Sequence, residues 1–311
     1  MALRIMVEHR GVTGGSSAPE PFQMWFDERD PFSPIAYRYP IKAELHRRRS
    51  PFQEIVVLET EFFGRMLVLD DVVQLTERDE FLYHEMLAHV PLHLLQRPER
   101  VLIVGGGDGG TLREVLKHPT IQRVTVVELD REVIEVAKEY FPGLARSFSS
   151  PKVTVHHADG VEFLRAAGEQ FDAILVDSTD PVGPAKALST PSFFASAKQR
   201  LTAQGLFAMQ TESLHFHVQH VDAVQAALRG VFPAVSLYAA PIATYAGNWW
   251  TFSLACRREN DWEPVRSPVD GTRVYGDALH RGAFVPAEVR SCFSAIAADW
   301  DRRETDGASP P

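Results

Sequence analysis

From residue 100 onward the chain alternates short apolar runs with helical patterns, and this alternation restricts its fold more than any other feature. Short apolar strands that alternate with helices are typical of a mostly parallel sheet covered by helices on both faces. We therefore predict an α/β domain whose sheet ends with two closing strands. The runs expected to be strands are Val101–Val104, Val124–Val127, Val153–His156, Ala173–Val176, Leu206–Met209, Val235–Ala239 and Trp250–Ala255.

The preceding part of the chain has a different pattern. Ile55–Leu58 and Met66–Leu69 are β-rich runs with a turn between them, which indicates an antiparallel unit. A helix is expected over residues 79–95, because apolar residues recur there every four positions. We expect a flexible leader over residues 1–20, a small N-terminal antiparallel β domain over 21–78, the α/β domain over 79–303 and a loose tail over 304–311.

The composition excludes several classes of protein. Thirty-two Lys and Arg residues against 41 Asp and Glu leave a formal net charge of −9, which argues against a broad surface for nucleic acid. No apolar run approaches the ~18 residues of a membrane span, so no membrane partner is expected. No signal peptide is apparent, which favours a cytoplasmic location. Cys256 and Cys292 lie in apolar surroundings and are expected to be buried, reduced thiols.

A glycine-rich loop, Gly105–Gly110, follows the first predicted strand of the α/β domain and opens a helix. This context suits a nucleotide-like ligand, and Glu128 ends the next strand at the distance where such folds place a carboxylate on a ribose. Asp108 lies inside the loop and would repel the pyrophosphate of a dinucleotide. A cofactor that carries a sulfonium or an ammonium fits better, which indicates an S-adenosylmethionine-type ligand. The alternative role for Asp108 is a helix N-cap.

Carboxylates stand at or just beyond the ends of successive predicted strands. In an open parallel sheet these ends border the ligand crevice. Each residue alone has an alternative role as a cap or turn residue. Together they would attract a polycation and raise some of their own pKa values, which suits a general base. The residues are Asp108, Glu128, Asp159, Asp177 and Asp180, and the loop 177–184 is long enough to act as a lid.

The histidines do not indicate a metal site. His84 and His89 are five residues apart, so on a helix their rings diverge and do not share a metal. His215, His217 and His220 suit a solvated helix start. No Gly-x-Ser-x-Gly motif is present, which disfavours a serine hydrolase.

With these motifs in view, the chain resembles the polyamine aminopropyltransferases, the family of the spermidine synthases. The similarity runs from about Trp25 to Phe284 and includes the glycine loop. The further matching motifs are Leu69–Phe81, Tyr83–Met86, Val127–Asp130, Asp159–Gly160, Asp177–Pro184, Gln210–Ser213, Tyr275–Asp277 and His280–Arg281.

The resemblance implies a Rossmann-like, methyltransferase-type catalytic domain behind the small β domain, in a homodimer or homotetramer. It also implies transfer of an aminopropyl group from decarboxylated S-adenosylmethionine, a co-substrate rather than a cofactor, to a diamine that is typically putrescine. The products would be spermidine and methylthioadenosine.

The resemblance also implies a role for individual residues. Asp177 would be the catalytic base, with Tyr83 beside the attacking nitrogen. The donor site would comprise Gln53, Gln74, Gly105, Gly107, Asp108, Glu128, Asp159 and Gly160. The acceptor site would comprise Trp25, His84, Asp108, Asp180, Gln210 and Tyr245.

The sequence departs from the family pattern beside the acceptor site. Ala243 and Ala246 replace two common prolines, and Leu214 replaces a third. Cadaverine, agmatine or a longer polyamine therefore remain alternatives to putrescine. A methyltransferase on the same fold and a polyamine-binding module without turnover are the other functional hypotheses.

Overall fold

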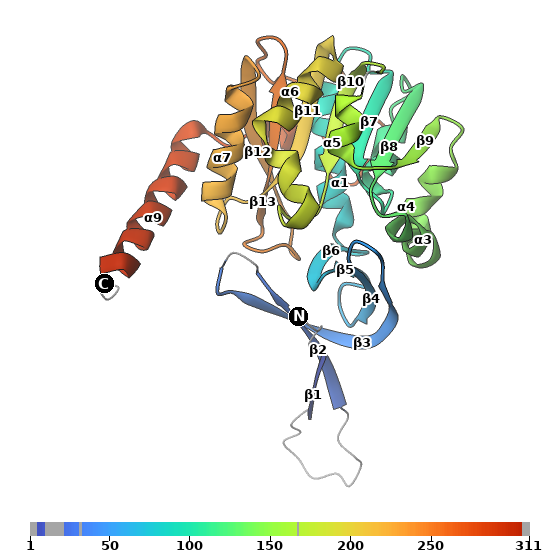
Figure 1. Ribbon diagram of the computed structural model, residues 1–311, viewed down its shortest axis with the longest axis vertical. Coiled ribbons are helices and arrows are strands. Elements are labelled where there is room, and N and C mark those ends of the chain that lie inside the picture. Colours follow the sequence, from blue (N-terminus) through green and yellow to red (C-terminus); the bar gives the residue numbers. More distant parts are fainter. Residues whose placement is uncertain (1–4, 10–21, 31–32, 167, 307–311) are drawn as a thin grey trace.

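The computed structural model describes residues 5–9, 22–30, 33–166 and 168–306. Two sheets form its framework, a six-stranded antiparallel sheet and a seven-stranded, mostly parallel sheet. The antiparallel sheet lies below one end of the parallel sheet in Figure 1. Its strands follow chain order: β1 (Ile5–His9), β2 (Phe22–Arg29), β3 (Ala36–Arg49), β4 (Glu54–Thr60), β5 (Arg65–Leu69) and β6 (Val72–Thr76).

The seven-stranded sheet has the order β12-β13-β11-β10-β7-β8-β9. Strand β13 runs in the direction opposite to the other six strands. The predicted Rossmann-like α/β fold with two closing strands is confirmed. The strands are β7 (Arg100–Gly105), β8 (Arg123–Glu128), β9 (Val153–His157), β10 (Phe171–Asp177), β11 (Leu201–Ser213), β12 (Ala234–Pro241) and β13 (Trp249–Cys256).

Helices cover both faces of this sheet, and alternate residues of β7 show how. Val101 and Ile103 pack in the cluster that includes α1 and α2, whereas Leu102 and Val104 pack toward α5 and α6. The helices are α1 (Glu80–His93), α2 (Gly110–Leu116), α3 (Arg131–Tyr140), α4 (Pro142–Ala145), α5 (Gly160–Arg165), α6 (Pro191–Arg200), α7 (Val218–Arg229), α8 (Asp277–Ala283) and α9 (Ala287–Asp306). Short 3₁₀ turns are η1 (Arg146–Ser149) and η2 (Gly183–Ser189).

The two sheets are joined by a shared apolar cluster and by buried polar contacts. Side chains of α3 and α4 pack against β4 and β5 in one cluster. Asp79, just before α1, accepts hydrogen bonds from the backbone N–H (3.1 Å) and the hydroxyl (2.8 Å) of Thr244. Tyr39 of β3 donates to the carbonyl oxygen of Thr244 (3.0 Å). These contacts fix the antiparallel sheet beside the carboxyl ends of the parallel strands.

Three expectations about the chain ends and thiols need correction. Ile5–His9 forms strand β1, paired with β2, so the leader predicted over 1–20 is wrong for these residues; the rest of it lies outside the described residues. The tail predicted from residue 304 is helical as far as Asp306. Cys256 is buried as predicted, but Cys292 is exposed, because α9 packs on α7 along one face only.

No helix within the described ranges combines the length and the apolar character needed to cross a bilayer.

Candidate active site

A cavity of about 460 Å³ lies at the carboxyl ends of β7, β8 and β10. The chain leaves β7 toward β8 on one side, whereas β10 pairs with β7 on the other. This is the switch point where open α/β sheets bind ligands. The cavity also extends to β2, β5 and β6 of the antiparallel sheet. All the predicted site residues line it except Trp25, which lies on β2 and whose role stays a prediction.

The glycine loop packs tightly against its neighbours. Gly105 has φ +84°, and a Cβ there would lie 2.0 Å from the carbonyl oxygen of Asp177. A Cβ on Gly110 would lie 2.2 Å from the imidazole of His84. The loop therefore makes room for parts of the protein itself, and it brings Asp108, His84 and Asp177 together.

Asp108, Asp177 and His84 form the polar centre of the cavity. Each contributes an atom to a group in which all three atoms lie within 4.8 Å of one another. The Tyr83 hydroxyl donates to Asp177 Oδ1 (2.8 Å), while Oδ2 has no hydrogen-bond partner within the described part of the chain. This arrangement leaves one oxygen of Asp177 buried in the wall of the cavity beside Thr111, without a firm hydrogen bond to the described residues.

The two carboxylates of this centre differ in acidity. Burial raises the pKa of Asp177 to about 6, and the negative charge of Asp108 adds to the rise. Burial by itself would also raise the pKa of Asp108, but the adjacent His84 outweighs it and lowers this pKa below its ordinary value. His84 Nε2 lies 3.2 Å from Asp108 Oδ1. At neutral pH, Asp108 is therefore the more firmly ionised of the pair.

One end of the cavity presents groups suited to a nucleoside. Glu128 ends β8, and burial raises its pKa to about 7. Asp159 caps α5 by accepting from the backbone N–H of Val161 (2.7 Å) and of Glu162 (3.2 Å). Gln53 reaches this end from the antiparallel sheet, and its side-chain amide donates to Asp130 (3.0 Å). The backbone carbonyl oxygen of Gln74 accepts from the Tyr245 hydroxyl.

The other end holds four carboxylates, Glu28, Asp30, Asp180 and Glu212, which we call the distal carboxylate group. Burial raises the pKa of Glu28 to about 8 and raises that of Asp180 well above its usual range. Glu212 has φ +71°, a left-handed conformation that is costly for a residue with a side chain. The local strain and the crowded acids indicate a binding region for a cation.

His217 lies among the distal carboxylates and was misjudged from the sequence. The prediction of a solvated helix start is wrong for this residue, which is 5% exposed. Its Nε2 lies 2.9 Å from Asp30 and its Nδ1 lies 3.2 Å from Glu212. Burial alone would lower the pKa of His217, but these two carboxylates raise it to about 9.

Sequence reasoning missed Glu28, Asp30 and His217 as site residues. Glu28 and Asp30 come from the antiparallel sheet, and no pattern along the chain links them to His217, which lies before α7. Glu212 could have been identified as a site residue from the sequence, because it lies inside the family motif Gln210–Ser213.

A second group of imidazoles, from His89, His93 and His118, is buried behind the site. Arg266 donates to His118 Nδ1 (3.2 Å), so His118 Nε2 donates to His89 Nδ1 (2.9 Å). His89 Nε2 then donates to Glu114 (3.0 Å). His93 Nδ1 donates to the His89 carbonyl oxygen (2.8 Å), while its Nε2 has no hydrogen-bond partner among the described residues, so the group is a polar chain with one nitrogen left over. The predicted divergence of His84 and His89 is confirmed, since His84 contacts Glu80 and Asp108 instead.

Two family models match the chain. The spermine/spermidine synthase domain matches residues 80–263, and the spermidine synthase tetramerisation domain matches residues 24–77. Polyamine aminopropyltransferase 1 of Aquifex aeolicus (strain VF5) is 49% identical over 261 residues, covering 84% of this chain and 93% of the relative. Polyamine aminopropyltransferase of Hydrogenobaculum sp. (strain Y04AAS1) is 44% identical over 263 residues, covering 85% and 94%.

Solved structures agree with these matches. A spermidine synthase in complex with the transition-state analogue AdoDATO superposes with a TM-score of 0.83 at 32% identity, covering 87% of this chain and 95% of that one. The spermidine synthase of Thermotoga maritima gives a TM-score of 0.81 at 31% identity, covering 88% and 94%.

Proposed function

Because this chain belongs to the spermine/spermidine synthase family and is an aminopropyltransferase, we propose that it acts on decarboxylated S-adenosylmethionine and putrescine. The products are spermidine and methylthioadenosine. The observation that carries the proposal is the carboxylate pair Asp108 and Asp177 at the switch point, in a cavity that continues to the distal carboxylate group. A cationic donor and a dicationic acceptor both complement such a cavity.

The donor occupies the nucleoside end. Asp108 pairs with its aminopropyl ammonium, Glu128 binds the ribose hydroxyls and Asp159 contacts the adenine. Ordinary S-adenosylmethionine carries a carboxylate on the same carbon as that ammonium, which Asp108 disfavours. The glycines Gly105, Gly107 and Gly160 let the backbone come near the donor. Gln53 and Gln74 help to enclose the donor site.

The acceptor lies between the carboxylate pair and the distal carboxylate group. A diamine is protonated in water, so its attacking nitrogen first loses a proton. Asp177 binds the ammonium and accepts that proton, and Tyr83 holds its carboxylate in place by donating to Oδ1. The wall around the acceptor is formed by Asp180, Gln210, Tyr245 and His84.

The free amine then attacks the aminopropyl carbon that is bonded to sulfur. A C–N bond forms, the C–S bond breaks, and its electron pair moves to the sulfonium to give neutral methylthioadenosine. Orientation of the two substrates in one cavity supplies much of the acceleration.

A product assay tests this function. The protein is supplied with decarboxylated or ordinary S-adenosylmethionine and a panel of putrescine, cadaverine, agmatine and spermidine, and the products are followed by mass spectrometry. We expect methylthioadenosine and a mass gain of one aminopropyl group, greatest with putrescine. S-adenosylhomocysteine would instead indicate a methyltransferase, and binding without product would indicate a module without turnover. A larger kcat/KM for another amine would replace putrescine as the acceptor.

Removal of metal ions is expected to leave kcat unchanged. The sulfonium is already an activated leaving group, so the transfer requires no Lewis acid, cofactor or covalent intermediate. The assay is repeated after dialysis against a chelator and after addition of Mg²⁺ or Zn²⁺. A loss of turnover that a single metal restores would contradict this expectation.

A homodimer or homotetramer in the cytoplasm is part of the same proposal. The match of residues 24–77 to a tetramerisation domain supports the oligomer.

A further inference from the structure

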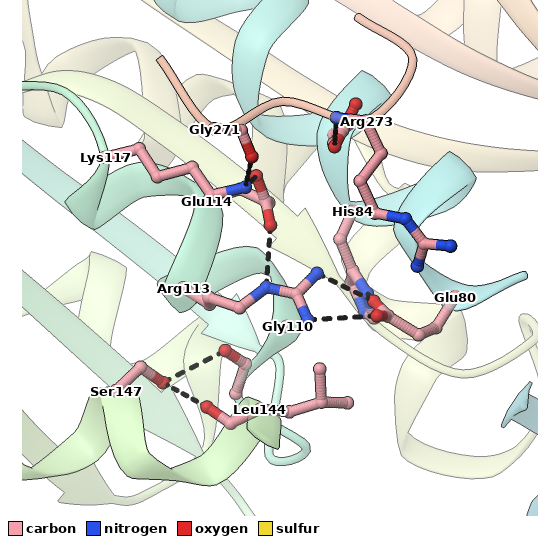
Figure 2. A network of polar contacts seen from close by, with 12 residues as sticks. Glu80, His84, Gly110, Arg113, Glu114, Lys117, Leu144, Ser147, Gly271 and Arg273 are labelled. Carbon is pink, nitrogen blue, oxygen red and sulfur yellow. Dashed lines mark hydrogen bonds and ion pairs between the residues drawn. The ribbon is translucent and has the colours of Figure 1, made fainter. Parts of the chain in front are cut away.

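A line of ion pairs runs from the carboxylate pair into the interior of the domain. His84 Nδ1 lies 2.7 Å from Glu80 Oε2, and Arg113 donates from Nη1 and Nη2 to both oxygens of Glu80 (2.9 Å each). Arg113 Nε also donates to Glu114 (2.7 Å). Figure 2 shows the Arg113 guanidinium between the two glutamates, with the His84 ring beside Glu80. Charges alternate in sign along this line.

Both ring nitrogens of His84 face carboxylates. Glu80 lies at Nδ1 and Asp108 at Nε2, so the ring donates at both positions when it is an imidazolium. The ring is held by the Tyr83 ring at 90° (5.3 Å between centroids) and by Gly110, where a methyl group would collide with it. Further charged groups on this side are Asp177 on β10, Arg113 on α2 and Arg273 (Figure 2). Burial acts against the charged ring, but Asp108 and Glu80 raise its pKa well above the usual range.

The proposed reaction needs two carboxylates ionised at the same time. Asp108 pairs with the donor ammonium, and Asp177 accepts a proton. Like charges this close disfavour double ionisation, so one carboxyl of such a pair normally holds a proton. A fixed cation beside the pair removes that penalty.

We propose that Glu80 and Arg113 are positioning residues that hold His84 as an imidazolium, so that Asp108 and Asp177 are both ionised in the ligand-free enzyme. The inference rests on the proposed function for its catalytic consequence. Glu80 is 8% exposed, and a carboxylate so buried stays charged only with a partner. The forked guanidinium of Arg113 supplies that partner and fixes the direction of the Glu80 carboxylate toward His84.

The test is the pH profile of kcat/KM for the donor. In Glu80→Gln, His84 loses one of its two anionic partners and keeps Asp108 at Nε2, so its pKa falls and the ring compensates the repulsion between Asp108 and Asp177 less well. We expect the acid limb of the profile to move upward by roughly one to three pH units, the influence of one opposite charge at this range. The activity deficit of Glu80→Gln should therefore shrink as the pH rises. Arg113→Lys, which keeps the charge but loses the fork, should shift the limb less and in the same direction.

A double-mutant cycle separates this role from a general effect on folding. His84→Gln should move the acid limb by itself, and adding Glu80→Gln to it should produce no further shift, because Glu80 acts through His84. Glu162→Gln, which breaks the exposed pair Glu162–Arg165, is the matched control and should leave the profile unchanged. Equal loss of activity at every pH, a downward shift, or additive shifts in the double variant would overturn the proposal.

A measurement on the ligand-free protein keeps this inference distinct from the proposed function. Ring ¹⁵N shifts of His84, assigned with His84→Gln and followed against pH, should report an imidazolium at pH 8 in the natural sequence and a lower ring pKa in Glu80→Gln. A neutral His84 in the natural sequence would refute the inference even where the enzyme makes spermidine. An imidazolium without any turnover would leave the charge arrangement standing and refute the proposed reaction.

Discussion

Asp177→Asn is expected to lower kcat roughly 10²–10⁴-fold, the usual contribution of a positioned general base. Asparagine has the same shape and still accepts the hydrogen bond that Tyr83 donates to Oδ1 (2.8 Å in the natural sequence). It has no basic oxygen for the proton of the attacking ammonium. Single-turnover kinetics with bound donor measure this effect, while calorimetry should show nearly unchanged donor affinity.

The pH profile provides the control for this variant. The pKa of Asp177 is raised to about 6, and the base acts when deprotonated, so kcat/KM for the donor should rise as the pH rises through about 6. Bound donor carries two positive charges, and these lower the pKa of Asp177. At saturating donor, the acid limb of the pH profile of kcat should therefore lie at lower pH. The rise in kcat/KM around pH 6, which reports the titration of Asp177, should be absent from the Asp177→Asn variant. Near-normal turnover of that variant would show that Asp177 is not the base.

Asp108→Asn is expected to lower kcat/KM for the donor by roughly 10²–10³-fold, since losing one partner of a buried charge pair costs about 2–5 kcal/mol. The amide leaves the donor ammonium without a counter-charge and places a neutral group against His84, whose Nε2 lies 3.2 Å from Oδ1. The effect is measured with decarboxylated S-adenosylmethionine under conditions of low donor concentration.

Methylthioadenosine is the matched ligand for this variant. It shares the adenine and ribose with the donor but has no aminopropyl ammonium. Its affinity, measured by calorimetry, should change far less than that of the donor. Equal losses for the two ligands would mean that Asp108 supports the whole nucleoside end rather than the ammonium.

The carboxylates of the nucleoside end were predictable because each belongs to a local pattern. Strand ends in a parallel sheet meet at one edge, so Asp108, Glu128, Asp159 and Asp177 could be placed together from the positions of four apolar runs. The glycine loop was predicted to admit a ligand. The structure adds that Gly105 and Gly110 also make room for the Asp177 backbone and the His84 ring.

The distal carboxylate group could not be predicted from local sequence patterns. Asp30 and His217 are 187 positions apart in the chain, yet their side chains meet at 2.9 Å. Only the docking of the antiparallel sheet on the α/β domain brings them together. The same histidine looks solvated in sequence because burial by distant segments leaves no periodic trace.

The sequence alone determined the alternation of strands and helices, the position of the switch point and the identity of the carboxylates around it. These follow from short-range patterning of apolar residues and from the parallel direction of the strands. The tertiary structure alone decided the charge state of each group, because a pKa depends on burial and on partners such as Glu80 and Arg113 that lie on different helices. It also decided the second acidic end of the cavity, which two separate domains build together.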